Sequence, residues 1–196
     1  MTYPATPRIP PQSPEEWAPD VRSVLTAERR GQPRLGDLNI FRTLARHPEL
    51  FKVWLPFGGL LLNGGTLPFA DRELVILRTG YNCRSPYEWG QHVRIAAGGG
   101  MERQLIDRVA AGPDAPGWDE RQTLLLRAAD ELHANARISE ATWTGLARHL
   151  NEKQLIELPM LVGQYHMVAF TLNSLGVQPE LGLERLPASA ADRVVH

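Results

Sequence analysis

The amino-acid sequence predicts an all-α fold, and three observations lead to this class. No stretch alternates apolar and polar residues over six positions with β-branched enrichment, so strand signals are nearly absent. Apolar residues instead recur at steps of three and four, as Leu74, Leu77 and Tyr81 do. Cap residues, prolines and glycines separate such segments at intervals that are typical of helices.

The first part of the chain combines a proline-rich arm with two helices. Residues 1–14 contain five prolines and little apolar periodicity, which predicts an extended arm, either disordered or laid across a neighbouring molecule. Ser13 and the Pro-Glu-Glu that follows it are typical of a helix start, so we expect a helix from there to about Arg30. A second, short helix is expected over 39–46.

The remaining chain is punctuated by further helix starts and stops. Prolines, Ser and Asn residues stand at the expected starts, and glycines stand at most of the expected ends. The expected helices span 48–63, 85–98, 102–111, 119–135, 139–150 and 151–176, and Pro68 and Asp71 precede a further helical run that ends before a turn at 82–84. The last helix is apolar around most of its circumference, which predicts a central position or a subunit interface.

The composition is that of one ordinary globular domain. The chain has 196 residues, 43% of them hydrophobic, and we assign 15–180 to a single domain between the arm and an irregular tail, 181–196. The net charge is −1 and no dense run of Lys or Arg occurs, so neither a nucleic-acid partner nor a membrane partner is expected. The N-terminus does not resemble a secretory signal, and a cytoplasmic protein is the default expectation.

Two details restrict the class further. The most apolar segment, 155–175, contains Glu157, Gln164 and His166, which favours a buried helix over a membrane span. Cys83 is the single cysteine, so an internal disulfide, a CxxC redox pair and a cysteine-rich zinc site are all excluded.

Residues 85–92 read SPYEWGQH and support two interpretations. As a helix start, Ser85 is the N-cap, Pro86 takes the first position, and Glu88 completes a capping box by reaching back to Ser85. As a proton-transfer site, Glu88 lies one turn before His92 and orients its imidazole, which then acts as a general acid or base.

The preceding helix carries further candidates. Glu73 approaches His92 if the two helices pack antiparallel across the turn at 82–84, and is otherwise a solvated first-turn acid. Arg78 can hold a carboxylate through its guanidinium, although it lies about 140° from Glu73 around an ideal helix. Glu73, Glu88 and His92 are also a conceivable divalent-ion site, but a single Glu-x-x-x-His differs from the paired Glu-x-x-His of di-iron helices, and we assign no metal.

Several other polar residues receive structural interpretations. His133 is expected to end a helix as a cation near the negative end of the dipole, and it shares no ligand spacing with His166. Tyr165 and His166 are expected to pack in the last helix. Cys83 is expected to be a small buried residue or a pocket wall, and Tyr87 to line a cavity or the core.

The segments ADRELVILRTGYNCRSPYEWGQHVRIA, DELH and LVGQYHMVAFTLNSLGV resemble the carboxymuconolactone decarboxylase family over roughly residues 45–180. That family shares a helical fold with alkyl hydroperoxidase D, whose branch uses Glu, eleven residues and then Cys-x-x-Cys-x-x-x-His. In this register Glu73 and His92 are kept, whereas Ser85 and Glu88 stand in place of the two redox cysteines. Because peroxide reduction needs a thiolate and a resolving thiol, the departure argues against a thiol peroxidase.

The resemblance implies an alkyl hydroperoxidase D-like helical bundle and a lyase that needs neither metal nor organic cofactor. It would act on a small carboxylated or lactone-like compound, with His92 transferring a proton, Glu88 orienting it and Glu73 relaying. The candidate substrate-binding residues are Arg78, Tyr87, Cys83 and Ser85. The family also implies a homo-oligomer, either trimer-based or dimeric. An isomerase or cyclase with the same site, and a non-catalytic oligomeric scaffold that binds a small molecule, remain as alternatives.

Overall fold

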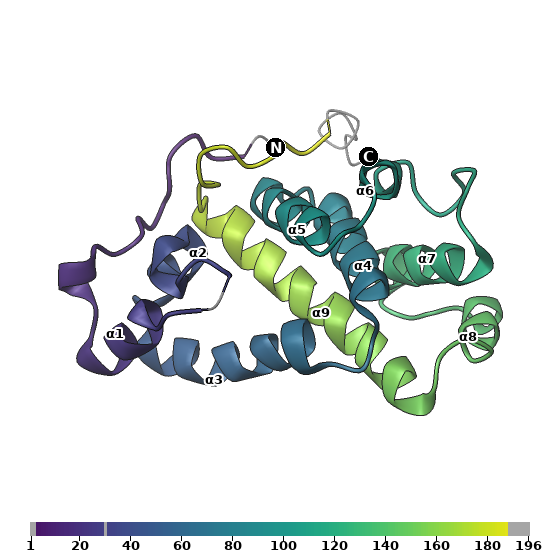
Figure 1. Ribbon diagram of the computed structural model, residues 1–196, viewed down its shortest axis with the longest axis horizontal. Coiled ribbons are helices and arrows are strands. Elements are labelled where there is room, and N and C mark those ends of the chain that lie inside the picture. Colours follow the sequence, from purple (N-terminus) through teal and green to yellow (C-terminus); the bar gives the residue numbers. More distant parts are fainter. Residues whose placement is uncertain (1–2, 30, 188–196) are drawn as a thin grey trace.

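The structure is a computed structural model that describes residues 3–29 and 31–187, and within these residues it contains helices and no strand (Figure 1). The helices are α1 (Pro19–Thr26), α2 (Asn39–Leu44), α3 (Pro48–Gly59), α4 (Phe69–Asn82), α5 (Pro86–Gly98), α6 (Arg103–Val109), α7 (Glu120–Asn135), α8 (Glu140–Leu146) and α9 (Glu152–Leu175). Short 3-10 turns at Pro14–Glu16 and Leu35–Asp37 and a π-helical turn at Leu60–Gly64 complete the set. The all-α prediction is confirmed.

Helices α4 and α9 form the centre of the molecule, and α9 runs through its middle (Figure 1). Helix α4 packs against α5, α7 and α9, and its apolar side chains are almost fully buried. Both ends of α9 follow the sequence signals: the Asn151 side chain accepts from the Gln154 N–H at 3.0 Å, and Gly176 ends the helix with a φ of 65°. The predicted central position of this helix is therefore confirmed.

Helix α9 has two faces of different character. Among the described residues it is the one helix long and apolar enough to cross a membrane, by length and composition alone, and half of its most apolar window is buried against the protein. A core helix passes the same test. Its outer face exposes four large apolar side chains, Ile156, Met160, Met167 and Phe170.

Two predicted helices are shorter in the structure. Ala18 has extended backbone angles, with φ −58° and ψ 144°, and Pro19 starts α1 because a proline at this position lacks the N–H that would continue an earlier helix. The residues before it form only the 3-10 turn, so the single helix expected from there to about Arg30 is wrong. Helix α8 ends at Leu146, ahead of the predicted end at Leu150.

The proline-rich arm packs against the helical domain of the same chain. Its Arg8 N–H donates to the Leu175 carbonyl at 2.8 Å, and its Gln12 N–H donates to the Arg42 carbonyl at 3.1 Å. The arm therefore lies along the C-terminal end of α9 and along α2. The expected disorder is wrong for residues 3–14, whereas docking on a neighbouring molecule stays a prediction. The first two residues lie outside the described part.

The segment after α9 is fastened over α2 and α5 by one carboxylate. Glu180 accepts hydrogen bonds from the Asn39 N–H at 2.7 Å, the Tyr87 hydroxyl at 2.8 Å and the Gln91 amide at 2.5 Å. The irregular tail expected from residue 181 has no helix as far as residue 187. The rest of that tail, 188–196, lies outside the described residues.

Helices α4 and α5 fold back on each other through a tight turn. Arg84 has a φ of 51°, and the Ser85 N–H donates to the Gly80 carbonyl at 2.9 Å. Gly80 allows the two helices to approach closely, since a Cβ there would lie 3.3 Å from the Glu88 Cβ. The turn places the two helices side by side, as the sequence suggested.

Candidate active site

A buried histidine–carboxylate pair joins α4 to α5. His92 Nδ1 lies 2.8 Å from Glu73 Oε2, and the Glu73 side chain has no solvent exposure. The His92 ring packs edge-on against Tyr165 of α9, with ring centroids 4.9 Å apart. The approach of Glu73 to His92, expected for antiparallel helices, is confirmed.

Arg72 fixes the direction of this hydrogen bond. Its Nε and Nη2 both donate to Glu73 Oε1 at 3.1 Å, so the carboxyl group is held as an acceptor. His92 Nδ1 is then the donor to Glu73, and Nε2 is the ring nitrogen left for a bound molecule. The orienting role that the sequence assigned to Glu88 belongs to Glu73, because Glu73 faces the imidazole across the helix pair.

Glu88 is a buried carboxyl group without a partner. Neither of its oxygens has a hydrogen-bond partner among the described residues, and burial raises its pKa well above the ordinary 4.5. This favours the neutral acid, which carries an O–H donor. Ser85 and Pro86 do hold the N-cap and first helical positions, but the predicted capping box is wrong because the Ser85 hydroxyl also lacks a partner.

A cavity of about 820 Å³ opens over this pair, between α2, α3, α4, α5 and α9. His92 and Glu88 line it together with Tyr87, Gln164 and Tyr165. Much of its wall is apolar, from Phe41, Trp54, Leu55, Leu62 and Phe69. Three arginines also line it, Arg29, Arg72 and Arg94. The cavity thus combines an apolar wall, positive charge and a proton-transfer pair.

Arg78 does not belong to this cavity, so its predicted role in substrate binding is wrong. Its Nε and Nη2 form a two-pronged ion pair with Asp130 of α7, at 2.6 Å and 2.8 Å. Its Nη1 donates to the carbonyls of Val109 and Ala110 at 3.0 Å and 3.3 Å. The guanidinium is directed to the opposite side of α4 from Glu73, as the angle between the two residues indicated.

The other predicted substrate-binding residues divide into two groups. Tyr87 lines the cavity, but its hydroxyl donates to Glu180 and accepts from the Ile40 N–H at 3.1 Å, which makes it part of the wall. Ser85 and Cys83 are not among the lining residues, so their predicted role is not supported. Reasoning from sequence missed Arg72, which looked like any solvated arginine next to a first-turn acid.

Replacing Glu88 by Gln should change how stability depends on pH. A raised pKa in the fold means that folding retains a proton which the unfolded chain releases above about pH 4.5. This contribution is complete below that pH and is lost as the pH rises toward the folded pKa. Between about pH 5 and 8 the free energy of unfolding of the natural protein should therefore fall with rising pH, whereas that of Glu88→Gln should not show this fall. Urea titrations at several pH values measure it; parallel curves would show that Glu88 is ionised in the fold.

Sequence comparison identifies one family. The model of the carboxymuconolactone decarboxylase family matches residues 48–131, which span α3 to most of α7 and include Glu73, Glu88 and His92. None of the curated proteins matches the chain in sequence.

Solved structures share the fold at low sequence identity. An uncharacterised peroxidase-related protein with an alkylhydroperoxidase AhpD core from Ralstonia eutropha JMP134 has a TM-score of 0.78 and 20% identity, covering 92% of this chain and 95% of that chain. A peroxidase-related protein from Silicibacter sp. TM1040 has a TM-score of 0.68 and 18% identity, with coverages of 74% and 78%. A cysteine-to-alanine variant of the debrominase Bmp8, in complex with 2,3,4-tribromopyrrole, has a TM-score of 0.71 and 14% identity, with coverages of 96% and 97%. Residues 48–131 therefore match the model of the carboxymuconolactone decarboxylase family, and the chain shares an AhpD-like fold.

Proposed function

We propose that this protein is a cofactor-independent acid–base enzyme that acts on a small carboxylated or lactone-like compound. One observation carries the proposal: His92, oriented by Glu73, faces a large cavity beside the neutral acid Glu88 and the guanidinium of Arg72. Such a site can accept a proton at His92 Nε2 and donate one from the Glu88 carboxyl group. A perturbed acid next to an oriented histidine in a cavity is typical of catalytic sites.

Loss of CO2 uses these groups in a simple order. The Arg72 guanidinium stabilises the negative charge that develops on a substrate carbonyl or lactone oxygen. The bond to the carboxylate carbon breaks, CO2 leaves, and the electron pair is delocalised into that carbonyl system. Glu88 or protonated His92 then delivers a proton to the substrate carbon, and solvent restores the enzyme.

The cavity suggests what the substrate looks like. Its volume of about 820 Å³ suits a molecule larger than a bare lactone, since ligand sites typically measure about 300–1,000 Å³. Aromatic side chains such as Phe41 and Trp54 favour an apolar body, and the three arginines favour a carboxylate. We therefore propose a carboxylated compound with an apolar or aromatic portion.

Thiol chemistry has little support in this chain. The two positions that carry redox cysteines in the hydroperoxidase branch are Ser85 and Glu88 here. Cys83 lies outside the cavity, and burial raises the pKa of its thiol to about 12. A thiol with so high a pKa is a poor nucleophile toward peroxide. We expect no peroxide-dependent turnover.

A panel of carboxylated lactones and β-keto acids with apolar substituents tests the proposal. Release of CO2 by the natural protein, lost in His92→Ala and retained in His149→Ala on the exposed surface, supports the decarboxylase. Exchange of substrate C–H for deuterium without CO2 supports the isomerase or cyclase alternative, which uses the same base. Binding without either reaction would leave the non-catalytic scaffold and overturn the enzyme proposal.

The proposal of a homo-oligomer leads to a separate prediction. The outer face of α9 exposes Ile156, Met160, Met167 and Phe170, and such contiguous apolar surface commonly marks an interface. We expect Ile156→Asp with Met160→Asp to lower the mass measured by light scattering to that of a smaller assembly. Lys153→Asp, an exposed polar position on the same helix, is the control. An unchanged mass in the double variant would place the interface elsewhere.

A further inference from the structure

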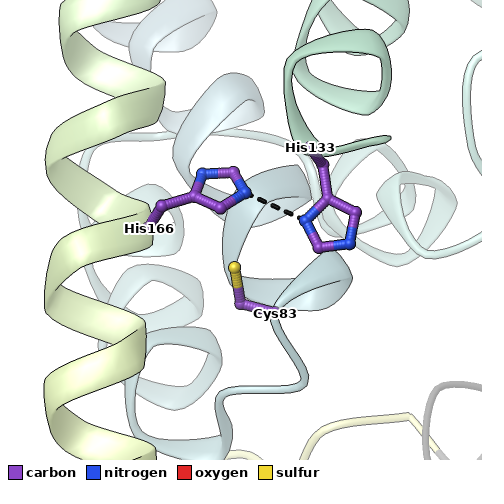
Figure 2. Close-up of side chains that lie close together, drawn as sticks. All are labelled: Cys83, His133 and His166. Atoms are coloured by element: carbon purple, nitrogen blue, oxygen red, sulfur yellow. Dashed lines mark hydrogen bonds between the residues drawn. The ribbon is translucent and has the colours of Figure 1, made fainter. Parts of the chain in front are cut away.

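A second cluster of chemically competent side chains lies outside the cavity. Cys83 follows α4, His133 lies near the end of α7, and His166 lies in the middle of α9, and the three side chains point toward one another (Figure 2). The sulfur and one nitrogen from each ring all lie within 4.8 Å of one another. Among the described residues this is the one such group of three possible metal ligands, and it does not include Glu73, Glu88 or His92.

The hydrogen bonds of His166 prepare one nitrogen for coordination. His166 Nδ1 lies 2.8 Å from the Val162 carbonyl oxygen, which can only accept, so Nδ1 carries the hydrogen and Nε2 presents a lone pair. Histidines that bind metals usually donate their second N–H to a carbonyl or carboxylate in this way. Nε2 points at His133 Nδ1, 2.9 Å away.

The spacing of the two rings suits one small ion. Zn–N bonds of about 2.0–2.1 Å at a tetrahedral angle place two nitrogens about 3.3 Å apart, so the pair must separate by only a few tenths of an ångström. His133 then shifts its hydrogen from Nδ1 to Nε2, on a side chain that is exposed to solvent. The exposed edge also gives an ion its entry path.

Cys83 completes the ligand set from the third element. Its carbonyl accepts from the Asn173 amide at 2.8 Å, which anchors the residue to α9 about two turns beyond His166. Because the free thiol is protonated at neutral pH, binding must release one proton as a sulfur–metal bond forms. Partial desolvation of the His133 ring and the nearby His166 lower the pKa of His133. The helix-ending cation expected for His133 from the sequence is not favoured.

We propose that Cys83, His133 and His166 form a zinc site that ties the ends of α4 and α7 to α9. One thiolate and two imidazoles are a ligand set that zinc takes in proteins, with a fourth position open to water. The site is independent of the acid–base pair, because none of its three residues lines the 820 Å³ cavity.

Zinc and cobalt titrations of the full-length protein, first stripped with a chelator, test the site. We expect one Zn²⁺ per chain, with release of a proton, and a rise in Tm that follows occupancy. Co²⁺ should give a near-ultraviolet thiolate-to-metal band, which can come only from Cys83, the single cysteine of the chain. Cys83→Ser should remove this band, and His133→Ala and His166→Ala should each weaken Zn²⁺ binding by more than about 100-fold.

Matched controls keep the result interpretable. His149→Ala removes another partly exposed histidine, paired with Glu120, and should bind Zn²⁺ as the natural protein does. Circular dichroism confirms that each variant is folded before titration. Full Zn²⁺ affinity in folded Cys83→Ser and His166→Ala, or absence of the cobalt–thiolate band in the natural protein, would overturn the site. Turnover in His133→Ala is expected to be unchanged, so failure here is separate from failure of the proposed enzyme.

Discussion

Replacing His92 by Ala is expected to lower kcat by about 10²–10⁴-fold, the usual contribution of a positioned acid or base. Glu73 orients the imidazole at the cavity, and the alanine methyl group can neither accept nor donate a proton there. Glu73→Gln should lower kcat less, because a glutamine carbonyl can still accept from His92 Nδ1 but cannot stabilise an imidazolium. Steady-state rates on the substrate found in the panel measure both effects.

The pH profile separates a catalytic from a structural role for this pair. If Glu73 stabilises the protonated imidazole during turnover, Glu73→Gln lowers kcat/KM by a factor that changes across the limb of the pH profile that His92 governs. A merely structural role would lower the rate equally at every pH. Full activity in folded His92→Ala would exclude acid–base catalysis by this residue.

Replacing Arg78 by Met should destabilise the protein by about 3–5 kcal/mol, the typical effect of breaking a buried ion pair. The guanidinium is nearly buried and binds both Asp130 and two carbonyls at the C-terminal end of α6. Its removal leaves the carboxylate with the Asn82 amide as its one hydrogen-bond partner among the described residues. For a chain of this size the change corresponds to a fall in Tm of about 10 °C. Urea and thermal unfolding measure it.

Arg127→Met is the matched control for this prediction. It lies on α7 like Asp130, and its ion pair with Asp114 is exposed, with side-chain exposures of 42% and 87%. Exposed pairs contribute about 0–1 kcal/mol, so little change is expected. At temperatures below its Tm, Arg78→Met should keep the kcat of the natural protein. If Arg78→Met loses substrate binding but keeps its stability, Arg78 binds substrate, and the structural role assigned to it here is wrong.

Local signals in the sequence were sufficient for most of the fold. Periodicity and caps located α4, α5, α7 and α9, because each buries a continuous apolar stripe and each has a clear start or stop. They failed at α1, where Pro19 follows a residue with extended backbone, and at the arm. A segment without apolar periodicity resembles a disordered one, but backbone hydrogen bonds to Leu175 and Arg42 order this arm. Partners so distant in sequence leave no local pattern from which they could be predicted.

The candidate site was predictable to a similar depth. The sequence identified Glu73, Glu88 and His92, and the register within α4 and α5 was enough to bring the first and last together. It misassigned their relation, since one turn of spacing suggested a Glu88–His92 pair while the helix packing selects Glu73. The pairing of His133 with His166 could not be predicted from the sequence either, because the two rings lie on different helices and meet only through tertiary packing.

The arm has a consequence for the order in which the protein is made. The Gln178 amide donates to the Pro4 carbonyl, so residues 174 positions apart share a hydrogen bond. During synthesis the arm emerges long before α9, and its binding surface exists only after α9 has left the ribosome. The helical core can assemble from shorter-range contacts in the meantime, so docking of the arm is the last step, and until it occurs residues 3–14 are open to proteases and chaperones.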